Sequence, residues 1–232
     1  DRIVNTVTSI SNEYEIIFIN DGSRDNSLAI IKKFAESNRQ IRYVDFSKNF
    51  GHQLAVFAGL EYATGDTIVI IDADLQDPPE LLNDMLGKMK ESGADVVYGQ
   101  RRTRAGETWF KTFAAKLFYR ILERSTDVSI PVDAGDFRLM SRRIADIIAQ
   151  MPERDRFIRG MVASVGFKQV AFPYDRQRRF AGSTKYPLAK MIHFATDAFL
   201  GYSMVLLRLS SIAALVLLLA LIGVAVYSIY AW

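Results

Sequence analysis

The sequence contains no cysteine, which excludes a disulfide scaffold, a thiolate zinc site and a cysteine nucleophile. It also lacks both common glycine patterns for phosphate binding, Gly-x-Gly-x-x-Gly and the P-loop, so dinucleotide oxidoreductases and P-loop NTPases lose their main support. Histidine is scarce. Because His52 and His193 have no second histidine at metal-binding spacing, we expect both to be packing or surface residues.

The composition indicates a folded body with some membrane contact. Of the 232 residues, 50% are hydrophobic and 24% are charged, which is too apolar for a disordered chain and too charged for a bundle of several membrane helices. The length allows one large domain, or one domain with an appendage.

Charge is divided unevenly along the chain. Residues 1–100 carry 9 basic and 16 acidic side chains, a net of −7, whereas residues 101–232 carry 20 basic and 10 acidic ones, a net of +10. A strongly basic half indicates a polyanionic partner, for which phosphates, lipid headgroups and nucleic acids are the candidates.

The C-terminal stretch Ile212–Trp232 has 21 residues without a charge. A helix rising ~1.5 Å per residue would reach roughly 31 Å over this stretch, about the thickness of a bilayer's hydrocarbon core. We therefore predict a transmembrane helix within residues 209–232, with a buried core helix as the alternative. Tyr227, Tyr230 and Trp232 provide aromatic residues for a headgroup belt. Basic residues precede the stretch and favour a cytoplasmic side for the preceding chain; they are Lys185, Lys190 and Arg208.

Short apolar runs alternate with helical patterns through the first hundred residues. We predict strands at 15–20, 41–46, 67–71 and 95–99, with helices after the first three. This alternation is typical of an α/β fold with a mainly parallel sheet flanked by helices. Such sheets place their ligands in the loops beyond the carboxyl ends of the strands.

Two further segments are amphipathic, at residues 109–122 and 186–202. The first puts Trp109, Phe113 and Leu117 on one side and basic residues on another. We expect both segments to lie in the membrane interface, because the predicted membrane helix anchors the chain nearby and the second segment leads directly into it. For the first, a core helix with a solvated cationic face is the alternative.

The most informative run is IDADLQDPPE, in which an apolar strand delivers Asp72 and Asp74 at alternate positions, with Gln76 continuing the series. Alternate side chains of an extended segment share a side, and hard oxygen ligands suit Mg²⁺ or Mn²⁺ held by a diphosphate. A solvated turn or helix cap is the alternative. Asp21 ends the first strand in the same way, where it can accept hydrogen bonds from a base or ribose, or serve only a turn.

Five runs in order carry a resemblance: IFINDGSRDNS, FSKNFGHQLAVFAGL, IDADLQDPPELL, GDFRLMSRR and RRFAGSTKY. Together they resemble family 2 glycosyltransferases of the GT-A fold, and among these the bacterial polyprenyl-phosphate (bactoprenol) glucosyltransferases, relatives of dolichyl-phosphate mannose synthase. The resemblance implies a GT-A domain over 1–184, an interface segment over 185–208 and a membrane helix over 209–232. The family's opening strand and a second membrane helix are missing, so we expect a piece of a longer protein.

The resemblance also implies roles for individual residues. On the donor side, it implies that Asp21 and Lys48 help hold the uridine and that Asp72, Asp74 and Gln76 form the diphosphate–metal site. The charge that develops on the leaving phosphate must also be neutralised, and Arg101 and Arg102, just past the fourth strand, are candidates for this. Asp136 corresponds to the proposed catalytic base, with Arg138 two positions on. A lipid phosphate is mostly ionised at neutral pH, so orientation is the larger role expected of Asp136. Arg178, Arg179 and Lys185 belong to a basic loop just ahead of the membrane-proximal segment, which favours capture of the acceptor phosphate, and Arg102 is assigned to the same phosphate.

Each of these roles has a plainer alternative. Asp136 could form only an ion pair with Arg138 or Arg142, the arginines after the fourth strand could belong to a solvated loop, and the basic loop could simply attract anionic lipid.

The predicted function is inverting transfer of a hexose, expected to be glucose, from a UDP-sugar to undecaprenyl or a similar polyprenyl phosphate. We expect the bacterial inner membrane, with the catalytic domain on its cytoplasmic side, and a homo-oligomer, which relatives suggest is a tetramer. Two alternatives remain: a processive polysaccharide synthase, whose Gln-x-x-Arg-Trp signature is absent, and a non-catalytic membrane-anchored nucleotide-binding protein. No nucleic-acid partner is expected.

Overall fold

The computed structural model describes residues 1–102, 134–153, 156–177 and 205–232. The chain divides into two units, one comprising Asp1–Trp109 with Ile130–Thr184 and the other Phe110–Ser129 with Lys185–Trp232. The predicted interface segments at 109–122 and 186–202 lie outside the described residues. The three predicted domain ranges stay a prediction.

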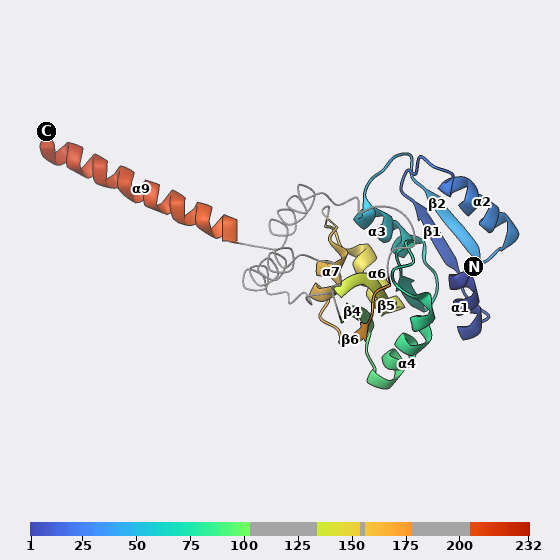
Figure 1. Ribbon diagram of the computed structural model, residues 1–232. Coiled ribbons are helices and arrows are strands. Elements are labelled where there is room, and N and C mark those ends of the chain that lie inside the picture. Colours follow the sequence, from blue (N-terminus) through green and yellow to red (C-terminus); the bar gives the residue numbers. More distant parts are fainter. Residues whose placement is uncertain (103–133, 154–155, 178–204) are drawn as a thin grey trace. The chain divides into compact units, whose positions relative to one another are not determined.

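The described strands of the first unit form two sheets (Figure 1). β1 (Ile16–Asn20) and β2 (Ile41–Asp45) pair in parallel. The second sheet has the order β3-β5-β4-β6, with bounds Thr67–Ile70, Ala134–Ser141, Val96–Arg101 and Gln169–Tyr174. β5 is antiparallel to both β3 and β4, and β4 is parallel to β6, so three of these four strands run the same way. The predicted α/β fold with a mainly parallel sheet is confirmed.

Helices follow the first three strands as the sequence predicts, and further ones flank them. Their bounds are α1 Arg2–Ile10, α2 Ser27–Ser37, α3 His52–Tyr62, the 3-10 helix η1 Pro79–Leu81, α4 Leu82–Ser92, α6 Arg142–Gln150 and α7 Ile158–Ser164. α1 was not predicted, although its apolar residues recur at helical spacing.

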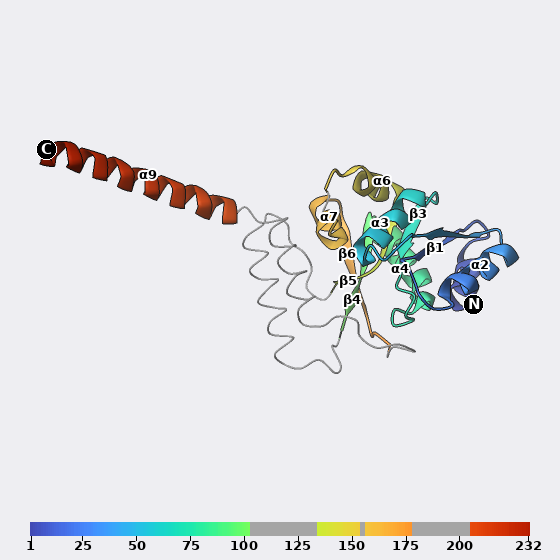
Figure 2. The ribbon, with the colours of Figure 1, turned by 90° about the horizontal axis from the view of Figure 1, so that it is seen from above.

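Two hydrophobic clusters cover the two faces of the four-stranded sheet. One joins β3 and β5 to α3, α6 and α7, and Figure 2 shows α6 and α7 close together over the sheet. The other joins α4 to β4, β5 and β6, with residues of α1 packed against it. Strand alternation divides β5 between the faces: Phe137 and Leu139 belong to the α4 cluster, whereas Met140 belongs to the α3 cluster. Asp136 and Arg138, in step with Met140, therefore lie on the α3 side.

The second unit contributes one described helix, α9 (Val205–Ala231). Its stretch Ser210–Ala231 has a mean hydropathy of 2.8 and is long and apolar enough to cross a membrane. None of this stretch is buried against the rest of the protein. Length and composition thus agree with the predicted span.

Glu15 ties the start of β1 to two later segments. Its carboxylate accepts hydrogen bonds from the Thr64 hydroxyl and from Arg42 on β2, each at 2.8 Å, and from the Thr64 backbone N–H. Burial alone would raise the pKa of Glu15, but these bonds outweigh it and lower the pKa below its ordinary value.

We predict that Glu15→Gln destabilises the protein at neutral pH and that this effect vanishes in acid. A lowered folded-state pKa contributes stability above the unfolded pKa of about 4.3, and the contribution is lost as pH falls through the folded value. Urea unfolding from pH 7 to pH 3 measures it. Glu13→Gln, at an exposed position, serves as the control. If the free energies of unfolding of wild type and Glu15→Gln changed with pH in parallel, the stabilising role of the ionised Glu15 would be contradicted.

Ile144 on α6 is fully buried in the α3-side cluster. Replacing it with alanine should lower the free energy of unfolding by about 2–5 kcal/mol, because a cavity is added to the lost apolar burial. Gln150→Ala, exposed on the same helix, should change it by less than about 0.5 kcal/mol. Denaturant unfolding of the three proteins in one detergent gives the comparison.

Candidate functional site

The end of β3 directs Asp72 toward α3. Ile68 and Ile70 pack in the α3-side cluster, whereas Val69 and Ile71 pack against the other face. Asp72 continues the first series, and its Oδ1 lies 3.9 Å from Nδ1 of His52, the first residue of α3. The carboxylate that the sequence predicts for a diphosphate–metal site thus lies beside an imidazole.

Asp136 is buried, with 5% of its surface exposed, and is surrounded by cationic groups. Arg159 of α7 donates two hydrogen bonds to it, from Nε to Oδ1 at 2.8 Å and from Nη2 to Oδ2 at 3.1 Å. His52 Nε2 lies 2.8 Å from Oδ2, and Arg138 Nη2 lies 3.8 Å from Oδ1. This pairing with Arg138 agrees with one alternative from the sequence; Arg142 instead contacts Gly65 and Asp146.

These cations set the charge of the cluster. Burial would raise the pKa of Asp136, but Arg159, His52 and Arg138 hold that pKa well below its ordinary range. Burial lowers the pKa of Arg138 to about 10, and the charge of Asp136 opposes this. Asp136 is therefore ionised at neutral pH and a weak proton acceptor, which favours an orienting role over that of a base.

The expectation for His52 was wrong in its placement: it is neither a simple packing residue nor a surface residue, because it lies between two predicted site carboxylates. Its hydrogen bond with Asp136 raises the pKa of the imidazole against the effect of burial. Burial also raises the pKa of Asp72, and the negative charges of nearby carboxylates add to this while His52 opposes it. His193 lies outside the described residues.

Asp74 and Gln76 lie in a tight loop after β3. The backbone N–H of Gln76 donates to Asp74 Oδ1 at 3.1 Å, and Leu75 between them has a φ of +58°. The Gln177 N–H donates to the Gln76 carbonyl at 2.9 Å, and the Gln76 side chain donates back to the Gln177 carbonyl at 3.3 Å. This loop is thereby joined to the chain that follows β6.

The same loop contains a buried carboxylate, Asp77, that is bonded to β6. Asp77, 1% exposed, accepts a hydrogen bond from the Tyr174 hydroxyl, and Arg176 Nε lies 3.4 Å from the same Asp77 oxygen. Burial and the bond to Asp77 raise the pKa of Tyr174 to about 12. The Tyr174 ring fits over Gly99 of β4, where a Cβ would lie 2.8 Å from Cε1 of that ring.

Asp21 is held by the loop before α3. Its carboxylate accepts hydrogen bonds from the backbone N–H groups of Phe50, at 2.6 Å, and Gly51, at 3.0 Å, and from the Asn49 side chain at 2.8 Å. Lys48 begins the same loop, and its ammonium lies 5.2 Å from the Phe50 ring centroid. The two residues predicted to hold uridine are thus neighbours in space, while their contact with a nucleotide stays a prediction.

The predicted phosphate-binding arginines that the structure describes, Arg101 and Arg102, lie at the end of β4 and just after it. Arg101 ends β4 and packs against Gly135, where a Cβ would lie 3.0 Å from its guanidinium. Its Nε is buried without a hydrogen-bond partner among the described residues. Arg102 is exposed, 3.7 Å from Asp175. Arg178, Arg179 and Lys185 lie outside the described residues.

The site fits a divalent cation by charge and ligand chemistry. Asp72 experiences the negative charges of Asp136, Asp77 and Asp74, and carboxylate oxygens suit Mg²⁺ or Mn²⁺. Among the described residues, no group of three or more histidine and acidic side chains is arranged to hold a metal by itself.

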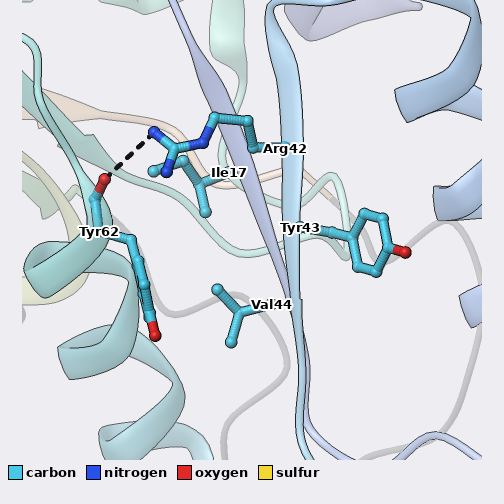
Figure 3. Close-up of a pocket in the computed structure, with 5 residues that line it drawn as sticks. All are labelled: Ile17, Arg42, Tyr43, Val44 and Tyr62. Carbon is cyan, nitrogen blue, oxygen red and sulfur yellow. Dashed lines mark hydrogen bonds between the residues drawn. The ribbon is translucent and has the colours of Figure 1, made fainter.

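A separate pocket of about 220 Å³ lies against β1, β2 and α3 (Figure 3). Arg42 extends across it toward the carbonyl of Tyr62, at 3.4 Å, beside Ile17 and Val44. None of the predicted site residues lines this pocket, so it does not mark the carboxylate cluster.

Sequence reasoning missed three residues that complete the site: His52, Arg159 and Tyr174. For His52 a signal exists, because it follows Asn49-Phe50-Gly51 directly at a predicted helix start. Arg159 and Tyr174 have no local signal. Arg159 reaches Asp136 across 23 positions of sequence, and Tyr174 reaches Asp77 across 97.

Neutralising Asp136 should destabilise the fold itself. Asp136→Asn leaves Arg138, 2% exposed, without its nearby countercharge, and breaking a buried ion pair in this way costs about 3–5 kcal/mol. Adding Arg138→Met should recover part of the loss, because it removes the orphaned charge. Denaturant unfolding of both variants measures this, and a loss below about 1 kcal/mol for Asp136→Asn would contradict it.

Comparison with known proteins gives a consistent result. The model for glycosyl transferase family 2 matches residues 1–148. The glycosyltransferase YkcC of Bacillus subtilis is 46% identical over 216 residues, covering 93% of this chain and 67% of the relative. A prophage bactoprenol glucosyl transferase homolog of Escherichia coli is 39% identical over 206 residues, covering 89% and 67%. The chain thus spans about two thirds of the length of these relatives.

A solved structure agrees in fold. Glucosyl-3-phosphoglycerate synthase from Mycobacterium tuberculosis, in complex with Mn²⁺ and UDP-glucose, aligns with a TM-score of 0.53 at 17% identity, covering 84% of this chain and 70% of that one. At this identity the likeness concerns the fold alone. The family model, in contrast, covers more than half of the sequence, and the chain belongs to glycosyltransferase family 2.

Proposed function

We propose that this protein transfers a hexose, glucose in the first instance, from a UDP-sugar to a polyprenyl phosphate such as undecaprenyl phosphate, with inversion at the anomeric carbon. The proposal depends on one observation: the His52 imidazole lies between Asp72, just after β3, and the ionised Asp136. That the carboxylates assigned to the donor and to the acceptor side neighbour the same imidazole supports the proposal.

The comparisons support the substrates by analogy. The Escherichia coli relative is named as a bactoprenol glucosyl transferase homolog, and a protein of Shigella phage SfV that is 37% identical over 196 residues is named a bactoprenol glucosyl transferase. The mycobacterial structure of the same fold contains Mn²⁺ and UDP-glucose.

On the donor side, the chain supplies oxygen ligands and a cation. Asp72, Asp74 and Gln76 would hold Mg²⁺ or Mn²⁺ together with the diphosphate, and Asp21 and Lys48 would hold the uridine. The metal ion, when bound, supplies positive charge that stabilises the departing nucleoside diphosphate. Arg101 would add to that charge from the end of β4.

On the acceptor side, Asp136 orients its neighbours rather than removing a proton. A phosphate monoester has a second pKa near 6, so the attacking oxygen is already largely ionised at neutral pH. Arg159 and Arg138 neutralise Asp136, which reduces repulsion of an incoming phosphate. Arg102, Arg178, Arg179 and Lys185 would bind that phosphate, since arginine forms paired hydrogen bonds with it.

The apolar helix α9 supports a membrane arrangement. Its apolar stretch would span the inner membrane of a bacterium, and basic residues before it would keep the catalytic unit on the cytoplasmic side. The segment 185–208 would rest on the lipid surface between them. We also propose a homo-oligomer, with a tetramer as the working number.

Purified protein in detergent, given radiolabelled UDP-glucose, undecaprenyl phosphate and Mn²⁺, should form a single glucolipid. Asp72→Asn and Asp74→Asn should each lower kcat by about 100-fold or more, because charge at the leaving diphosphate is lost. Chelation of the metal should have the same effect. Asp84→Asn, which neutralises an exposed carboxylate on α4, should leave the rate unchanged.

The product distinguishes the alternatives. A polymer in place of a single-sugar lipid would indicate a polysaccharide synthase. Failure to form glycolipid from any of UDP-glucose, UDP-galactose or GDP-mannose, with the nucleotide still bound, would indicate a binding protein and overturn the proposal.

A further inference from the structure

His52 contacts carboxylates that come from two different strands. Its Nε2 lies 2.8 Å from Asp136 on β5, and its Nδ1 lies 3.9 Å from Asp72 just after β3. The first distance is a hydrogen bond and the second is within ion-pair range. One imidazole therefore lies between the two groups that the proposed function assigns to different substrates.

The orientation of this ring is fixed from the Asp136 side. Arg159 holds both oxygens of Asp136, so the carboxylate that anchors Nε2 cannot turn freely. Arg159 is placed by α7, whose first N–H, that of Ile158, donates to the Gln53 side chain at 2.9 Å. Gln53 adjoins His52, so the two ends of this arrangement are linked to each other.

The backbone at His52 is fixed as well. Asp21 accepts hydrogen bonds from the N–H groups of Phe50 and Gly51, immediately before α3 begins. Gly22 packs so closely on this loop that a Cβ there would lie 2.5 Å from backbone atoms of Lys48 and Asn49. The first turn of α3 thus has little room to shift.

A histidine anchored through one ring nitrogen by a carboxylate presents its other nitrogen in a defined direction. We propose that His52 is a positioning residue, which holds the Asp72 and Asp136 carboxylates at a fixed separation. An acceptor phosphate oxygen can then attack the anomeric carbon from the side opposite the leaving UDP, whose bond to that carbon breaks as the new bond forms. This inference rests on the proposed function and adds the link between its two halves.

Three substitutions test it in the full chain. His52→Ala removes both contacts. His52→Gln places an amide N–H near the Nε2 position, toward Asp136, whereas His52→Asn places one near Nδ1 without reaching Asp136. Leu54→Ala, at an exposed position in the same turn of α3, is the matched control and should keep wild-type activity.

We expect His52→Ala to lower kcat by about 10- to 100-fold, as loss of such an orienting contact does elsewhere. At saturating Mn²⁺, the KM for UDP-glucose should change by less than about threefold, because the uridine contacts are kept and the metal site is filled. His52→Gln should recover more activity than His52→Asn, since it keeps the anchor. A wild-type kcat in His52→Ala, or a glutamine variant no better than alanine, would overturn the inference.

A binding measurement separates this inference from the proposed function. Mn²⁺ with UDP, titrated by electron paramagnetic resonance, should bind about 10-fold more weakly to His52→Ala, because Asp72 is no longer oriented. If wild type forms no glycolipid, the proposed function fails while this titration still reports on His52. Unchanged Mn²⁺ affinity in His52→Ala would refute its effect on Asp72.

Discussion

The burial of a charged carboxylate at Asp136 is the constraint on which the rest of the site depends. Removing such a charge from water costs several kcal/mol unless cationic partners surround it closely. Here the partners come from three elements, Arg138 from β5, His52 from α3 and Arg159 from α7. The fold must therefore bring α3 and α7 onto the same face of β5, and that requirement places the start of α3 beside the end of β3.

The loop after β3 is held by a second set of contacts, independent of the first. Asp77 is joined to Tyr174, and Gln76 exchanges two hydrogen bonds with Gln177. Gln177 directly precedes Arg178 and Arg179 in the sequence, which are predicted to bind the acceptor. The residues proposed for the metal and the first residues proposed for the lipid phosphate are thus connected through one short piece of backbone.

Much of the fold could be predicted because it depends on local pattern. The apolar runs at β1 to β4 gave the strands within about two residues. β5, which carries Asp136, was not predicted, because the alternation of strands and helices ends near residue 100. His52, by contrast, meets Asp136 across 84 positions, and its place at a predicted helix start does not indicate which residue its ring contacts. Pairings that depend on how α3 and α7 pack cannot be read from spacing.

Charge arithmetic located a basic half but not the pairing within it. Arg138 and Arg159 count toward the net positive charge, yet both are committed to Asp136. Because Asp136 is already counted among the acidic residues, leaving out these three residues still leaves 18 basic and 9 acidic side chains in that half, a net of +9 for an anionic partner.

Gly99 illustrates how far the site extends into the interior. Because Gly99 has no side chain, the Tyr174 ring can lie against β4 while its hydroxyl donates a hydrogen bond to Asp77. Any larger residue would push the Tyr174 ring, whose hydroxyl binds Asp77 in the loop after β3. A defect in glycosyl transfer at this position would then arise from steric displacement of an interior tyrosine, although no chemical group of the reaction had been altered.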